Sequence, residues 1–157
     1  MKESLFNIVL VNPEIPQNTG NIGRLCVSTG CALHLIKPLG FSLEDSYLKR
    51  AGLDYWKHLD LQVYESWEFF MKKNFGAVLF FFSTKTERCF WDCPCGPSSF
   101  FVFGNESSGF PPDFYQRYEE SLYTIPMPGD FHRSLNIANA VSVVVYEGIR
   151  KTLGVVL

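Results

Sequence analysis

Side chains able to bind a small ligand gather in three loop-like segments of this 157-residue chain. The richest covers residues 125–136, where prolines and a glycine lead into Ser134 and Asn136. Backbone amides and carbonyls of such a loop can read the edge of a heterocycle such as adenine, and apolar side chains can wall a slot. The side chains expected to form these walls are Ile125, Met127 and Leu135. Ser and Asn also favour helix starts, so a simple capping role for Ser134 and Asn136 stays open.

The second segment, residues 18–24, suits an anion. Its glycines allow close approach of the backbone, and amides at a helix start attract negative charge. Arg24 adds a fork of N–H donors that matches a phosphate, and Asn18 adds an amide beside it. The alternative is a helix cap followed by a surface arginine.

The third segment, residues 103–109, begins with Phe103 and Gly104 after an apolar run. It resembles a nucleotide-binding turn but lacks the G-x-G-x-x-G pattern, which disfavours a dinucleotide cofactor. Glu106 lies between two glycines and could accept a hydrogen bond from an amine or a ribose. An ordinary strand-to-helix turn is the alternative.

The elements that must position these segments follow a β-α-β order. Apolar runs predict strands at residues 7–11, 32–36, 61–64, 77–82, 99–103 and 122–125. Helices are predicted at residues 21–29, 46–51, 66–73, 111–118 and 135–153. This order predicts a single α/β domain over residues 1–157, with a mostly parallel sheet and helices on both faces. In such sheets ligands bind beyond the carboxyl ends of the strands, where all three segments would lie.

The last predicted helix has an unusual charge pattern. Between Arg133 and Glu147 it contains no charged residue, and apolar side chains occupy nearly every face. A helix of this kind is covered on more than one side, by a core and by a further contact such as a second subunit.

Composition narrows the class of protein. The chain is 46% hydrophobic and 19% charged, which is typical of a folded globular protein. No stretch is long enough to span a membrane, and the first 12 residues lack signal-peptide features, so we expect a cytoplasmic protein without membrane contact. The net charge of −2 gives no sign of nucleic-acid binding. Cys89, Cys93 and Cys95 lack a paired C-x-x-C and a fourth ligand, so no metal is expected.

Taken together and in this order, the segments resemble the motifs of the SPOUT class of RNA methyltransferases. The likeness is greatest to its small tRNA (cytidine/uridine-34 2′-O) methyltransferases of the TrmL/YibK type. Residues 12–24, 103–109 and 133–147 are similar to the three family motifs, and residues 50–56 also match. The resemblance therefore covers nearly the whole chain. Two positions depart from the family pattern: Ser108 stands where arginine is usual, and the loop before Arg133 is one residue longer.

The resemblance implies an α/β knot, with a trefoil knot in the C-terminal half of the chain. It implies a homodimer whose paired C-terminal helices build shared active sites. S-adenosyl-L-methionine would lie bent in the knot, in contact with residues 103–104, 125–127 and 134–136. The substrate would be tRNA, methylated on the ribose 2′-hydroxyl of the wobble nucleotide at position 34, a cytidine or a modified uridine.

The resemblance also assigns roles to individual residues. Arg24 would contact the phosphate of the target nucleotide and assist removal of the hydroxyl proton. Arg133 would contact the RNA. Tyr146 would lie near the dimer and tRNA surface, with a position in the core as the alternative. The residues that would orient the substrate or the motif loops are Asn18, Glu106, Ser134 and Asn136.

Two alternatives to wobble methylation remain at this stage. One is 2′-O-methylation of another RNA, either ribosomal RNA or a different tRNA position. The other is a non-catalytic RNA- or nucleotide-binding protein that retains the knot.

Overall fold

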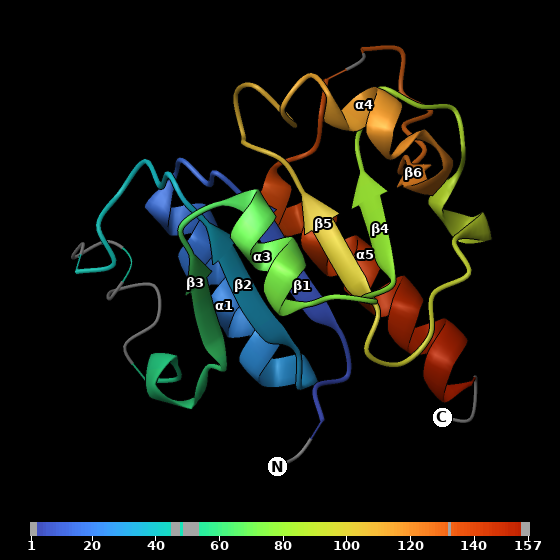
Figure 1. Ribbon diagram of the computed structural model, residues 1–157. Coiled ribbons are helices and arrows are strands. Elements are labelled where there is room, and N and C mark those ends of the chain that lie inside the picture. Colours follow the sequence, from blue (N-terminus) through green and yellow to red (C-terminus); the bar gives the residue numbers. More distant parts are fainter. Residues whose placement is uncertain (1–2, 45–47, 49–53, 132, 155–157) are drawn as a thin grey trace.

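Six strands form one sheet at the centre of the molecule (Figure 1). The computed structural model describes residues 3–44, 48, 54–131 and 133–154. The sheet order is β3-β2-β1-β5-β4-β6, and every pairing between these strands is parallel. The strands are β1 (Asn7–Val11), β2 (Ala32–Ile36), β3 (Leu61–Tyr64), β4 (Leu79–Phe82), β5 (Phe100–Phe103) and β6 (Leu122–Tyr123). The predicted parallel sheet is therefore confirmed.

Helices cover both faces of the sheet, as the sequence predicts. The helices are α1 (Pro16–Thr29), α3 (Trp67–Lys73), α4 (Phe114–Arg117) and α5 (Ile137–Leu153). The short 3₁₀ turns are η1 (Trp56–His58), η2 (Phe90–Asp92) and η3 (Glu119–Ser121). The predicted helix at residues 46–51 lies outside the described residues, apart from Leu48.

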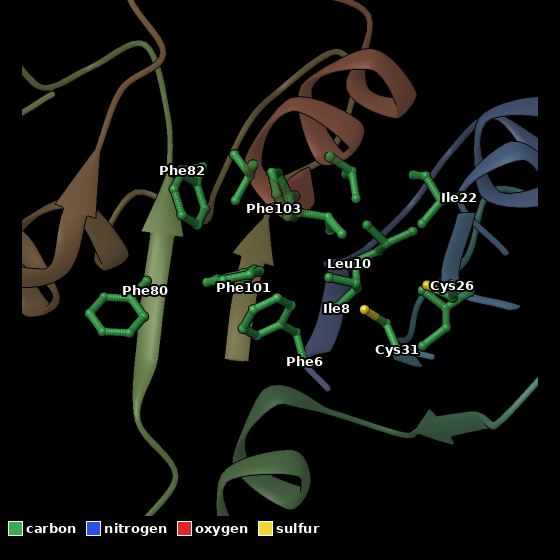
Figure 2. Close-up of a cluster of buried hydrophobic side chains, with 14 of the residues drawn as sticks. Phe6, Ile8, Leu10, Ile22, Cys26, Cys31, Phe80, Phe82, Phe101 and Phe103 are labelled. Carbon is green, nitrogen blue, oxygen red and sulfur yellow. The ribbon is translucent and has the colours of Figure 1, made fainter. Parts of the chain in front are cut away.

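Alternate side chains of the strands build two cores. One core joins β1 and β5 to α1 and α5, and Figure 2 shows Ile8, Leu10 and Phe101 within it, with Ile22 and Cys26 of α1 beside them. The other core lies on the opposite face, where α3 and α4 pack on the sheet. The central strands are buried on both sides, which explains why they are apolar without alternation.

Several predicted boundaries were wrong. Helix α1 begins at Pro16 rather than residue 21, so residues 18 and 20 are helical instead of belonging to a loop. Proline is compatible with this position because the first turn of a helix does not need its N–H. Strand β6 ends at Tyr123 rather than residue 125, because Thr124 instead exchanges backbone hydrogen bonds with Arg88 and Phe90.

The other elements differ from prediction only in length. Helix α5 starts at Ile137, with Asn136 as its cap, instead of at residue 135. Helix α4 is limited to Phe114–Arg117, shorter than the predicted 111–118. Strands β4 and β5 begin one or two residues later than predicted. Helix α3 starts after Ser66, whose hydroxyl accepts a hydrogen bond from the Phe69 amide as a cap.

A polar network centred on His34 lies inside the second core. The His34 Nδ1 atom is 2.9 Å from the Tyr64 hydroxyl, and Nε2 is 3.0 Å from Asn7 Oδ1. The side chain is only 2% exposed and lies among the rings of Tyr64, Phe70 and Phe100. This burial lowers the pKa of His34 from 6.5 to about 4, although Asp60 partly opposes the change.

The lowered pKa of His34 predicts acid sensitivity. Since the folded protein binds this proton less readily than the unfolded chain, the contribution is complete above about pH 6.5 and is lost as pH falls toward 4. Between pH 7.5 and 4.5 the free energy of unfolding should fall by about 2 kcal/mol on this account alone. Urea unfolding at both pH values should show a smaller fall for His34→Gln, with exposed His58→Gln as the control. An equal fall in wild type and His34→Gln would contradict this assignment.

Candidate functional site

A cavity of about 490 Å³ opens beyond the carboxyl ends of β4, β5 and β6. This is the edge at which open parallel sheets bind ligands, and the volume is within the usual range for small-molecule sites. All three predicted segments contribute to it. The described residues that line it are Ile15, Asn18, 82–85, 103–110, Tyr115, 124–125, Met127, 133–137 and Ala140.

The turn after β5 forms one wall and is closed by its own hydrogen bonds. The Asn105 Oδ1 atom accepts hydrogen bonds from the amides of Ser107 and Ser108, both at 2.9 Å. Its Nδ2 donates to the Asn12 carbonyl at 2.7 Å, which ties the turn to the loop after β1. A Cβ atom on Gly104 would lie 2.5 Å from the carbonyl carbon of Gly109. Only glycine at position 104 allows the two ends of the turn to approach this closely.

Glu106 projects from this turn to the start of α1. Its carboxylate accepts hydrogen bonds from the Glu14 amide at 3.1 Å and the Ile15 amide at 2.5 Å. Helix α1 has no capping side chain at Ile15, so Glu106 supplies both the acceptor and the negative charge that a helix start favours. The sequence suggested an amine or ribose as its partner, but in this structure both oxygens bind backbone.

Removing this carboxylate should weaken the fold. Glu106→Ala leaves the amides of Glu14 and Ile15 without their acceptor, and we expect the free energy of unfolding to fall by roughly 1–2 kcal/mol. Glu106→Gln keeps one acceptor oxygen and should cost less. Urea denaturation measures both, with Ala at exposed Glu87 as the control. Equal stability of Glu106→Ala and wild type would show that the carboxylate does not hold the helix start.

Asn18 and Asn136 link α1 to α5 at the opposite wall. The Asn136 Nδ2 donates to Asn18 Oδ1 at 3.0 Å, and Asn18 is only 8% exposed. The Asn136 Oδ1 accepts from the amides of Ala138 and Asn139. Asn136 is therefore the N-terminal cap of α5, as one of the two sequence interpretations held, and it also ties the start of α5 to α1.

The loop before α5 brings further predicted residues to the cavity. Ile125, Met127, Arg133, Ser134 and Leu135 all line it. Leu135 is 43% exposed, so an apolar side chain faces solvent where the cavity opens. Arg133 is an exposed cation on the same wall.

Two predicted site residues, Arg24 and Tyr146, lie outside the cavity. Neither is among the described residues that line the cavity of their own chain. The Arg24 side chain is exposed, with Cζ 5.9 Å from the centre of the Tyr55 ring. Tyr146 is 58% exposed on α5, and Val143 beside it is 40% exposed.

Residues 83–85 and Tyr115 line the cavity, although no sequence pattern predicts them as site residues. Lys85 is a cation at the cavity wall, and its Nζ lies 4.6 Å from the centre of the Tyr115 ring. The signal was available, because residues 83–85 follow the carboxyl end of a predicted strand. The residue types at 83–85, however, form no known ligand-binding motif by themselves.

The described part of the chain lacks two other features. No group of three or more His, Cys, Asp or Glu side chains there could hold a metal ion. No helix among those residues is long and apolar enough to cross a membrane.

Several known RNA methyltransferases are similar to this chain. The model of the SpoU rRNA methylase family matches residues 5–146. A tRNA (cytidine(34)-2′-O)-methyltransferase from Burkholderia ambifaria is 45% identical over 151 residues, covering 94% of this chain and 96% of the relative. A protein of the same name from Methylovorus glucosotrophus is 45% identical over 148 residues, with the same coverage of both chains.

Solved structures agree with this fold. One, described as giving structural insights into the 2-OH methylation of C/U34 on tRNA, superposes with a TM-score of 0.88 at 44% identity, covering 93% of this chain and 95% of that chain. The SpoU methyltransferase AviRb from Streptomyces viridochromogenes, in complex with the cofactor AdoMet, shares the fold at 22% identity with a TM-score of 0.83, covering 96% of this chain and 59% of that chain. With a family match over most of its length, this chain belongs to the SpoU methylase family.

Proposed function

We propose that the protein transfers the methyl group of S-adenosylmethionine to the ribose 2′-hydroxyl of nucleotide 34 in tRNA, a cytidine or a modified uridine. The observation that carries this proposal is the end-to-end similarity to tRNA (cytidine(34)-2′-O)-methyltransferases, at 45% identity. A cavity of suitable size at the expected edge of the sheet supports it. The whole chain, residues 1–157, would act as one domain, and a tRNA substrate accords with a cytoplasmic location.

The cavity has the features that S-adenosylmethionine needs. Its volume of about 490 Å³ suits a ligand of this size, and Ile125, Met127 and Leu135 offer apolar contact for an adenine ring. Phe103 and Gly104, at the end of β5, line the same cavity. Related AviRb has been solved with AdoMet, which supports the same cofactor class. Once bound, S-adenosylmethionine supplies a methyl group on a positively charged sulfur and needs no further activation.

The protein must therefore orient the ribose and help remove its proton. A bond forms between the 2′-oxygen and the methyl carbon, the bond from that carbon to sulfur breaks, and the hydroxyl proton is released. Arg24 carries a guanidinium, and this group is a poor general base. We assign it instead to the target phosphate, where its fork of donors can hold the nucleotide in line and let the phosphate assist proton removal.

We also propose a homodimer in which each cavity is completed by the partner. Arg24 lies outside the cavity of its own chain, yet the family motif gives it a role at the reacting group. Helices α1 and α5 pack together, and α5 exposes Val143 and Tyr146 in its uncharged part. A surface of this kind is typical of a subunit contact. Pairing through it would bring Arg24 and Tyr146 of one subunit toward the cavity of the other.

A trefoil knot in the C-terminal half is the last part of the proposal. Strand β6 lies at the sheet edge beside β4, whereas α5, which follows it, packs on α1 and on the core side of β5. In a knotted chain, the segment between them would thread through the connection from β4 to β5, to which Thr124 is hydrogen bonded. An experimental structure in which residues 126–136 pass outside the 83–99 connection would contradict the knot.

The decisive experiment compares tRNA with ribosomal RNA as the substrate. The purified protein is incubated with S-adenosylmethionine labelled in its methyl group and with either bulk tRNA or ribosomal RNA, and the labelled nucleosides are mapped. We expect label only in tRNA, as 2′-O-methylated nucleotide 34. Label in ribosomal RNA or at another tRNA position would support a different RNA target. Binding of S-adenosylmethionine without any transfer would support a non-catalytic protein.

A further inference from the structure

Tyr55 makes two contacts with one turn of α1. Its hydroxyl donates a hydrogen bond to the Gly20 carbonyl at 3.2 Å. Its ring centre lies 5.9 Å from Cζ of Arg24, four residues further along the same helix. The two contacts together place an aromatic face beside a guanidinium group that is otherwise exposed to solvent.

The neighbours of Tyr55 pack on the same turn. The Trp56 ring lies over Gly23, where an added Cβ would be 3.0 Å from Trp56 Cζ3 and 3.3 Å from Leu59 Cδ2. Glycine at position 23 thus leaves room for this segment directly beside Arg24. Residues 55–59, far away in sequence, therefore pack on the turn of α1 that carries Arg24.

An arginine side chain has many rotamers, and fixing them for each substrate slows a reaction that depends on orientation. An aromatic ring against one face of a guanidinium restricts those rotamers but leaves the N–H groups at its edge free for a phosphate. Tyr55 offers such a face, and its hydroxyl contact with Gly20 keeps the ring in place.

We propose that Tyr55 is a positioning residue that holds the Arg24 guanidinium in the orientation needed for methyl transfer. This inference rests on the function proposed above and adds a residue to it. Burial raises the pKa of the Tyr55 phenol, while Arg24 acts in the opposite direction. The phenol therefore keeps its proton at neutral pH and acts as a donor, not as a base.

The test compares two substitutions at Tyr55. Tyr55→Phe keeps the ring and loses only the hydroxyl, whereas Tyr55→Leu removes the aromatic face. In single-turnover methyl transfer at saturating tRNA and S-adenosylmethionine, we expect Tyr55→Leu to be about tenfold slower and Tyr55→Phe to stay within about threefold of wild type. Binding of S-adenosylhomocysteine should change less than about twofold, because Tyr55 does not line the cavity.

A matched control is available on α3. Phe69 also lies against a cation, with Nζ of Lys73 5.4 Å from its ring centre, and it is exposed and does not line the cavity. Phe69→Leu removes the same kind of contact and should leave the single-turnover rate unchanged. Equal rates for Tyr55→Leu and wild type, or equal losses in both Tyr55 variants or in Phe69→Leu, would overturn the proposal.

A second measurement does not depend on activity. In the ¹H–¹⁵N spectrum of the wild-type protein, the Arg24 Nε–H signal, assigned with Arg24→Lys, should be displaced by the Tyr55 ring and should move on Tyr55→Leu but little on Tyr55→Phe. An unmoved signal in a folded Tyr55→Leu protein would reject the contact. If wild type methylates no RNA, the proposed function fails, while this spectrum still decides whether Tyr55 orders Arg24.

Discussion

Arg24→Ala is expected to reduce methyl transfer to tRNA about 1,000-fold while leaving cofactor affinity within about twofold of wild type. The first effect follows from the role assigned to Arg24, which binds the target phosphate and aligns the ribose oxygen. The second follows from its position, since Arg24 is not among the residues that line the cavity of its own chain. Initial rates with tRNA and calorimetric titration with S-adenosylhomocysteine measure the two effects separately.

Two controls make this prediction specific to Arg24. Arg24→Lys keeps the charge but not the fork of donors, and we expect an intermediate rate. Arg117→Ala removes an exposed arginine on α4 that also lies beside a tyrosine ring but does not line the cavity, and its rate should match wild type. Undiminished turnover by Arg24→Ala would reject its role in the reaction.

Gly104→Ala, unlike Arg24→Ala, is expected to act on cofactor affinity, which should be weakened at least about tenfold. A Cβ there would lie 2.5 Å from the Gly109 carbonyl carbon and 2.8 Å from the Phe110 nitrogen, so the backbone of the turn must move. Such overpacking costs about 1–3 kcal/mol and displaces the wall that faces the cofactor. Calorimetry and urea unfolding measure the two consequences.

Gly96→Ala is the matched control for this substitution. A Cβ at Gly96 meets no atom within 4 Å, so the same chemical change should be tolerated. Wild-type affinity for S-adenosylhomocysteine in Gly104→Ala would mean that the turn after β5 does not form the cofactor wall.

The two variants also test the shared active site. If Arg24 serves the cavity of the partner, a dimer of one Arg24→Ala and one Gly104→Ala subunit keeps one intact site. At a subsaturating concentration of S-adenosylmethionine, random assembly of the co-expressed variants should then give about a quarter of wild-type activity, whereas Gly104→Ala alone keeps about a tenth or less and Arg24→Ala alone about a thousandth. Activity no higher than the sum of the separate variants would contradict sharing between subunits.

The sequence was sufficient to predict the sheet because its strands are buried on both faces and are therefore continuously apolar. The start of α1 could not be predicted in this way. Its cap is Glu106, which comes from the turn after β5, and no local pattern around Ile15 indicates a helix start there. The predicted end of β6 was wrong for a similar reason, since the backbone hydrogen-bond partners of Thr124 lie in the distant segment around Arg88.

The candidate site also has parts that the sequence could predict and parts that it could not. Residues in the turn after β5 and the loop before α5 were predicted to meet, and the cavity brings them together because parallel strands end at one edge of the sheet. The position of Arg24 relative to the cavity could not be predicted, since it depends on how α1 packs and on which of its faces remains exposed. Residues 50–56 match the family in sequence, but this match assigns Tyr55 no role, because its contact with Arg24 appears only in the folded chain.

One measurement tests the proposed reaction most directly. Three synthetic tRNAs are compared, one with ribose throughout and two in which a single 2′-hydroxyl is replaced by hydrogen, at nucleotide 34 or at the adjacent nucleotide 35. We predict that transfer of labelled methyl from S-adenosylmethionine is abolished by the change at nucleotide 34 and persists with the change at nucleotide 35. Undiminished labelling of the tRNA that lacks the 2′-hydroxyl of nucleotide 34 would contradict the account.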